Sequence, residues 1–228
     1  MSFDFAADPT TKLEATDLLG LESYARQRSA LRPRVIAHKK RRTVHCGPNA
    51  SLCFEDRQTV QYQVQEMLRI ERIFEPQGIA DELAAYNPLI PDGSNWKATL
   101  LVEFPDPEER RAALARLKGI DGRCWVQVQG HARVYAIADE DLERENEEKT
   151  SSVHFLRFEL DARMVADVKR GAAIGIGVDH ECYRHEVSPL PAEVRDALAR
   201  DLVSSNRRKC TEEVFSSVSR SRSSSAMA

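Results

Sequence analysis

The sequence lacks the features that mark membrane-spanning, secreted and metal–thiolate proteins. Its longest apolar runs, such as ATLLVEF, are far shorter than a transmembrane helix requires. The N-terminus is acidic and has neither the basic nor the apolar region of a signal peptide. The five cysteines form no CxxC pair, and their odd number favours reduced thiols over a disulfide framework. These absences predict a cytoplasmic protein with no membrane attachment.

The sequence also lacks an excess of charge of one sign. Its 33 lysines and arginines nearly balance 36 aspartates and glutamates, which gives a formal net charge of −3. A chain with so small a net charge has no global field that attracts nucleic acid or anionic membranes. Any electrostatic function must therefore come from local patches.

Motifs for cofactor, metal and nucleophilic chemistry are missing as well. There is no P-loop, GxSxG or HExxH pattern, and Gly175 and Gly177 follow a predicted helix where a dinucleotide fingerprint would follow a strand. The segment HECYRH (180–185) offers two histidines and a cysteine but no second ligand pair. We therefore expect no metal and no cofactor, and we favour a protein without catalytic activity.

What is present is a regular alternation of strand and helix patterns. Hydrophobic residues make up 42% of the 228 residues, enough for one large domain with a sizeable core. The pattern predicts an α+β fold: a single domain at residues 16–203, with a largely antiparallel sheet of six or seven strands packed by five or six helices. Residues 1–15 are expected to form a flexible tail, and the Ser/Arg-rich residues 204–228 a disordered one.

Particular elements follow from local signals. A helix is expected over residues 16–30, and Pro33 either interrupts it or starts a short second turn that reaches His38. The segments RTVHC and SLCFED predict a first hairpin, and a second is expected around a two-residue turn at Gly130 and His131. The clearest helix follows Asp106, which is its expected cap. Together these elements supply the helices and the two hairpins of the predicted fold.

The most informative element is a helix predicted from Asp56 to Phe74, with Asp56 as its expected cap. At 100° per residue, its apolar arc consists of Val60, Val64, Met67, Leu68, Ile70 and Phe74, and Glu71 falls within this arc. A carboxylate in a core must be paired, hydrogen-bonded or protonated. A buried salt bridge to Arg34, Arg57 or Arg157 is slightly favoured over a functional carboxylate, and fraying of the helix end would let Glu71 turn outward.

A second unusual residue is His154, which the alternation of VHFLRFEL places on an apolar strand face. Such a histidine is more often a satisfied core residue than a ligand or proton shuttle. If His45 joined Glu71 and His154, the three could carry acid–base chemistry. Arg57 and Arg69 would then complete a site for a small molecule or anion.

A surface for a protein partner is the other possibility. The polar face of the 56–74 helix and the loop 87–95, with Leu89 and Ile90 exposed, would form it. The residues predicted to contact a partner, ligand or anion are Arg57, Gln61, Gln65, Arg69, Arg72, Asn87, Asp92 and His38, with Gln58 on the same helix face.

The segment 26–42 is the most basic part of the chain, with eight lysines or arginines and no acid. Cations at the end of a helix are favourable in themselves, and aromatic residues that would stack on bases are nearly absent. The acidic run 139–148 could neutralise the segment. RNA binding is therefore less favoured, and His38 and His45 beside these cations are expected at the surface.

Long segments of the chain resemble a known family. VIAHKKRRTVHCGPNASLCFEDRQTVQYQVQEMLRIERIFE, YNPLIPDGSNWKATLLVEF and TSSVHFLRFEL are similar to a bacterial family of uncharacterised proteins, domain of unknown function family 3501, over residues 18–203. The resemblance implies no activity. It does imply a redox or oxidative-stress setting beside rubrerythrin-like and iron–sulfur oxidoreductase proteins, and hence a ferritin-like or iron–sulfur partner.

Overall fold

The computed structural model describes residues 7–138 and 149–203. The acidic run 139–148, predicted to balance the basic segment, and the predicted Ser/Arg tail 204–228 lie outside the described residues. The part of the chain that is described contains six α-helices and two antiparallel sheets, so the predicted α+β class is confirmed.

The strands form two separate sheets where the sequence predicted one. The five-stranded sheet has the order β1 (Thr43–His45), β2 (Ala50–Phe54), β3 (Asn95–Val102), β7 (Val153–Glu159) and β6 (Ile137–Ala138). The four-stranded sheet has the order β5 (Val134–Tyr135), β4 (Cys124–Val128), β8 (Ile174–His180) and β9 (Tyr183–Val187). All neighbouring strands are antiparallel.

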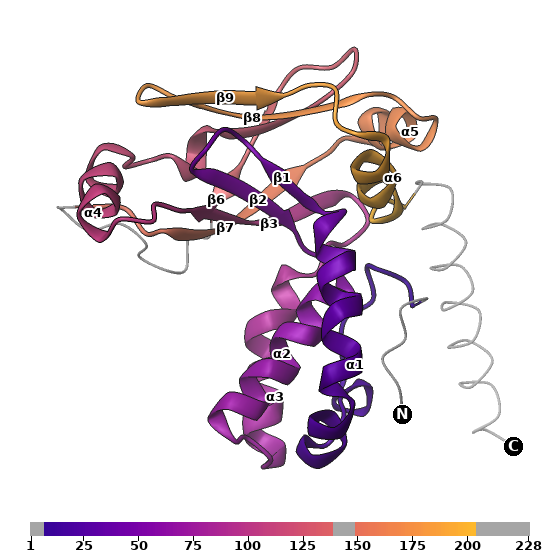
Figure 1. Cartoon of the computed structure of the whole chain (residues 1–228). Coiled ribbons are helices and arrows are strands. Elements are labelled where there is room, and N and C mark those ends of the chain that lie inside the picture. Colours follow the sequence, from indigo (N-terminus) through magenta and orange to yellow (C-terminus); the bar gives the residue numbers. More distant parts are fainter. Residues whose placement is uncertain (1–6, 139–148, 204–228) are drawn as a thin grey trace, which may run out of the picture.

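The main hydrophobic core lies between these sheets, which face each other in Figure 1. Because side chains alternate along a strand, β3 directs Ala98, Leu100 and Val102 inward as its sequence predicts. The four-stranded sheet supplies its own buried side chains, among them Ile174 and Ile176. Helices α4 (Pro107–Arg116), α5 (Ala162–Lys169) and α6 (Ala192–Arg200) lie at the ends of the two sheets (Figure 1).

The other three helices project away from the sheets and form a unit that we call the helical arm (Figure 1). It consists of α1 (Leu21–Lys40), α2 (Arg57–Glu71) and α3 (Pro76–Tyr86). Asp56 caps α2 as predicted, because its side chain accepts hydrogen bonds from the backbone of Gln58 and Thr59. The arm has its own small apolar clusters, separate from the core between the sheets.

The predicted helix over 16–30 is wrong in its bounds. Residues Ala15–Asp17 form a 3-10 turn, and α1 continues through Pro33 to Lys40. Pro33 is exposed, while Leu31 and Val35 beside it are buried. Packing of these two side chains stabilises the helix although proline lacks the N–H that would donate a helical hydrogen bond. Leu13 is 3% exposed, so the predicted N-terminal tail is packed against the protein at this residue.

The predicted two-residue turn at Gly130 and His131 is also wrong. Strands β4 and β5 pair only through Trp125 with Tyr135 and Val126 with Val134, which leaves a longer connection. Within it the His131 backbone donates to the Val128 carbonyl at 2.9 Å. Gly130 has φ +85°, so it occupies the third position of that turn, where only a residue tolerating positive φ fits well.

Candidate functional site

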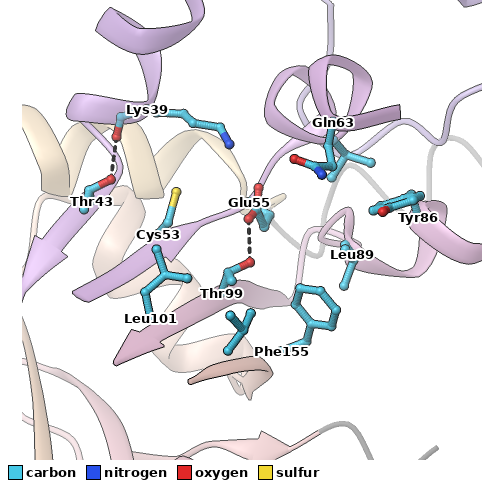
Figure 2. A pocket seen from close by; sticks show the side chains of 12 residues that line it. Lys39, Thr43, Cys53, Glu55, Gln63, Tyr86, Leu89, Thr99, Leu101 and Phe155 are labelled. Atoms are coloured by element: carbon cyan, nitrogen blue, oxygen red, sulfur yellow. Dashed lines mark hydrogen bonds between the residues drawn. The ribbon is translucent and has the colours of Figure 1, made fainter. Parts of the chain in front are cut away.

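A pocket of about 450 Å³ lies between the outer face of the five-stranded sheet and the helical arm (Figure 2). We call it the sheet-face pocket. Strands β2, β3 and β7 form its floor, and all three helices of the arm contribute to its walls. The residues that line it are Lys39, Thr43, Cys53, Glu55, Val60, Gln63, Tyr86, Leu89, Thr99, Leu101, Val153 and Phe155.

Strand register brings the floor residues together. Cys53 lies opposite Thr99, and Thr99 lies opposite Phe155, so three strands present one row across the sheet. Leu101 and Val153 form the next row. These residues alternate with the core residues of the same strands and therefore face the arm.

One end of the pocket is polar and carries charges of both signs. Glu55, only 9% exposed, accepts a 2.7 Å hydrogen bond from Thr99 and a second from the hydroxyl of Thr59. The Lys39 ammonium reaches toward the same end, above Cys53 (Figure 2). Burial, and then the charge of Glu55, raises the pKa of the Cys53 thiol. At neutral pH Cys53 is therefore a protonated thiol.

The other end of the pocket is mainly apolar. Leu89 and Phe155 line it, together with the ring of Tyr86 and the side chain of Gln63 (Figure 2). Burial raises the pKa of Tyr86, so its hydroxyl stays protonated at neutral pH. An elongated molecule with one polar and one apolar end matches this division.

A buried charged cluster lies on the other side of the same α1–β1 and β2–α2 junctions. Arg42 is 2% exposed and donates to the backbone carbonyls of Phe54 and Glu55 at 2.9 and 3.1 Å. It pairs with Asp201, and its guanidinium lies 3.4 Å from the Asp56 carboxylate. His38, predicted at the surface, is instead mostly buried: its side chain is 17% exposed, and its imidazole donates to Asp56 at 2.7 Å.

The pKa values of the two carboxylates in this cluster, Asp201 and Asp56, are shifted in opposite directions. Burial raises the pKa of Asp201 to about 7, against the opposing effect of Arg42. Burial also acts to raise the pKa of Asp56, but Arg42 and His38 outweigh it and lower that pKa to about 2. A second pocket of about 320 Å³ adjoins the cluster, with Arg41 and Arg200 also lining it.

Neighbouring residues therefore serve different sites. Lys39 and Glu55 line the sheet-face pocket, whereas His38 and Asp56 belong to the charged cluster. Thr59 connects them, because its hydroxyl donates to Glu55 and its backbone N–H donates to Asp56. Where the basic segment meets the sheets, His38 and Arg42 are engaged within the protein, whereas Lys40 and Arg41 are exposed.

The three residues predicted to carry acid–base chemistry do not come together. Glu71 is exposed, and its predicted place in the core is wrong, because α2 ends there and Arg72 is left-handed with φ +56°. Glu71 lies fourteen residues after Arg57, the first residue of α2, so it is about 20 Å from the end of the helix that meets the sheets. His45 is exposed on β1.

His154 is buried at 1% exposure, as the strand pattern predicts. Its Nε2 donates to the Ser151 carbonyl at 2.9 Å, and its Nδ1 lies 3.5 Å from Asp121. These contacts hold the histidine locally within the core region, and it lines neither pocket.

The polar face of α2, predicted as a contact surface, is largely buried. Gln61 and Gln65 are 2% and 0% exposed, and Gln58 is buried too. Gln65 both donates to and accepts from the backbone of Leu19, and Gln61 donates to the Asp17 carbonyl at 2.7 Å. Polar residues on this face are thus internal because the segment before α1 covers them.

The remaining predicted contact residues are mostly occupied. Arg57 pairs with Asp17 at 2.7 Å, and Arg69 lies 3.4 Å from Glu66, while Arg72 is exposed. In the loop after α3, the Asn87 side chain accepts from the Leu13 backbone, and Asp92 accepts from Ser94. Ile90, predicted at the surface, is completely buried in the arm, and Leu89 is partly buried.

Sequence reasoning missed most of the residues that line both sites. Of the predicted contact residues, Leu89 lines the sheet-face pocket, and His38 and Gln58 line the second pocket. Asp56 was recognised only as a helix cap, and Glu55 beside it carries no local signal of burial. Asp201 follows α6 and meets Arg42 across 159 positions of sequence, a separation that no periodicity encodes. Among the described residues, no three His, Cys, Asp or Glu side chains are grouped so as to hold a metal ion.

The fold and pocket define an α+β protein of two antiparallel sheets with a helical arm and a cavity of small-molecule size. The chain belongs to the family described as protein of unknown function (DUF3501), whose model matches residues 12–202. None of the helices in the described part of the chain is long and apolar enough to cross a bilayer.

A solved structure from the same comparisons agrees with this fold. It is the crystal structure of a novel protein of unknown function from Burkholderia pseudomallei K96243, which is 53% identical in sequence. The match covers 85% of this chain and 100% of that chain, with a TM-score of 0.81. Comparison with curated proteins gives no match.

Proposed function

We propose that this chain is a small-molecule-binding protein whose ligand occupies the sheet-face pocket. The observation that carries the proposal is the pocket itself, with an apolar floor and a few polar groups gathered at one end (Figure 2). Ligand sites are typically concave and mostly apolar, with a small number of placed polar groups, and its volume falls within their usual range.

Binding without covalent chemistry fits the polar end best. A thiolate, not a thiol, is the nucleophile in cysteine catalysis, and the raised pKa of Cys53 keeps its thiol protonated. Glu55 is held by two threonine hydroxyls, which fix the orientation of its carboxylate. This end of the pocket is suited to recognising polar groups.

The test is a pocket-filling substitution, Leu101→Trp, in the full chain. Leu101 lies on the pocket floor, so the larger ring should occupy the ligand's space. Ile36→Trp is the matched control, because Ile36 is exposed on α1 and is not among the lining residues. Each protein is exposed to a metabolite extract, washed and examined by native mass spectrometry.

The wild type and Ile36→Trp should retain the same small molecule, and Leu101→Trp should lose it. The proposal fails if the wild type retains nothing, or if Leu101→Trp retains the molecule as well as the wild type does. Circular dichroism and thermal melting establish that each variant is folded.

A second proposal follows from the family resemblance: an accessory protein of a redox module that contacts a ferritin-like or iron–sulfur protein. The observation that favours a protein partner is the exposure of two large apolar side chains: Ile70 in the last turn of α2 is 60% exposed, and Phe74 just after the helix is 68% exposed. Such large exposed apolar side chains often mark contact sites.

A pull-down with the tagged full chain and with an Ile70→Ser/Phe74→Ser variant tests this second proposal. The wild type should capture a ferritin-like or iron–sulfur protein that the double variant does not. Equal capture by both proteins, or capture of neither kind of partner, would contradict it.

A further inference from the structure

The polar end of the sheet-face pocket contains one cation and one anion that do not pair with each other. Lys39 comes from the last turn of α1, and Glu55 directly follows β2. Neither makes an ion pair within 4.0 Å with any residue in the described parts of the chain. Both nevertheless line the same cavity.

The groups around this pair leave room for ligand contacts. Each carboxylate oxygen of Glu55 accepts one threonine hydroxyl, from Thr59 and from Thr99. A carboxylate oxygen has a second acceptor site, so Glu55 can still accept from a ligand's N–H groups. The hydroxyl of Thr43, at the same end of the pocket, donates to the backbone carbonyl of Lys39.

Beyond the charged pair the pocket is lined by side chains that suit an apolar group. Val60, Leu101 and Val153 also line it, and Leu89 and Phe155 line the end away from Lys39 with the Tyr86 ring (Figure 2). A molecule that spans the pocket therefore has its charged groups beside Lys39 and Glu55 and an uncharged, apolar body beyond them.

We propose that the ligand is a small zwitterion, an α-amino acid with an apolar side chain, whose ammonium binds Glu55 and whose carboxylate binds Lys39. The inference rests on the proposed function and specifies its ligand class. A zwitterion pairs both protein charges at once. A ligand with a single charge leaves either Lys39 or Glu55 desolvated and without an opposite charge, which is strongly unfavourable in a partly buried site.

Isothermal titration calorimetry on the full chain tests the ligand class. The probes are L-leucine and L-phenylalanine, with two derivatives of the latter: N-acetyl-L-phenylalanine, which lacks the ammonium, and L-phenylalaninamide, which lacks the carboxylate. At least one free amino acid should bind with 1:1 stoichiometry. If phenylalanine is the one that binds, both derivatives should bind at least about tenfold more weakly; if leucine binds instead, its own N-acetyl and amide derivatives replace them.

Two substitutions assign each charge to its partner group. Glu55→Gln should remove the preference for the free ammonium, so that the free amino acid and its N-acetyl derivative bind alike. Lys39→Met should remove the preference for the free carboxylate, so that the free amino acid and its amide bind alike. Glu71→Gln and Lys40→Met are the matched controls, because both residues are exposed and neither lines the pocket.

The inference is overturned if no free amino acid binds, if the derivatives bind as tightly as the parent, or if the controls have the same effect as the pocket variants. Its failure is separable from failure of the proposed function. If the wild type retains a molecule that is not a zwitterion and Leu101→Trp does not retain it, the proposed function stands and only the ligand class is wrong. If Leu101→Trp retains the molecule, both the proposed function and the ligand class are contradicted.

Discussion

At the scale of single residues, the buried Arg42 connects three segments of the described structure. It joins the end of α1 to the β2–α2 junction and to the end of α6 through Glu55, Asp56 and Asp201. Removing one partner from a buried charged network leaves uncompensated charge, which costs far more than losing an exposed pair.

We therefore predict that Arg42→Met lowers the free energy of unfolding by about 3–5 kcal/mol. Arg41→Met is the control: Arg41 is exposed, so its substitution should change stability by no more than about 0.5 kcal/mol. Urea denaturation followed by circular dichroism measures both. Equal stability of the two variants would show that the cluster does not hold these segments together.

Asp201 should make the stability of the folded protein depend on pH, and its raised pKa determines the direction of that dependence. Its ordinary value is 3.8, and burial raises it to about 7 in the folded protein. Between these values the folded chain holds a proton that the unfolded chain has released, so this group's contribution to stability falls as pH rises. Its slope cannot exceed about 1.4 kcal/mol per pH unit.

Asp201→Asn should therefore reduce the loss of stability between about pH 4 and pH 7 relative to the wild type. Urea denaturation at pH 4, 5, 6 and 7 measures the slope for each protein. The comparison of slopes is independent of any constant loss that the substitution causes. Identical slopes would contradict a raised pKa at this position.

At the scale of elements, α2 shows which features helical periodicity can predict and which it cannot. Its cap and its buried residues Val60, Val64 and Leu68 follow from the sequence. The burial of its glutamines does not, because the segment before α1 covers them through hydrogen bonds formed over 46 positions of sequence. Glu71 was misplaced for a related reason: helical periodicity was extended to a residue where the helix ends.

Gln65→Ala should lower the stability of the folded protein, although glutamines usually lie at the surface and are easily replaced. The substitution leaves the backbone N–H and C=O of Leu19 without their side-chain partner and opens a small void. We expect a loss of about 2–4 kcal/mol in the free energy of unfolding. Gln77→Ala in α3, which is exposed, should change it by no more than about 0.5 kcal/mol. A loss at Gln65 as small as that at Gln77 would refute its role in fixing the N-terminal segment.

At the scale of the whole molecule, the two sheets and the helical arm have separate hydrophobic clusters of different size. Regions with few buried apolar contacts open more readily than the main core. The sheet-face pocket lies where the arm meets the sheet, so motion of the arm would alter the pocket walls.

Hydrogen–deuterium exchange should therefore show faster exchange in α3 than in β3, β7 and β8. A bound ligand should slow exchange at the arm residues that line the pocket, around Gln63 and Tyr86, more than in α4, which is remote from it. Uniform protection of α3 and the central strands would show that the arm and the sheets open as one unit. Mass spectrometry of peptic fragments provides the measurement.

The α+β class, the caps of α2 and α4, the core face of β3 and the burial of His154 could be predicted from the sequence. Each of these depends on residues close together in the chain, where alternation and capping chemistry act. The polar residues that form a site could not be identified in this way. The sheet-face pocket needs the β2–β3–β7 register and all three arm helices, and Arg42 meets Asp201 only because α6 packs back against the end of α1. Such contacts depend on how distant elements pack, and no local pattern specifies that.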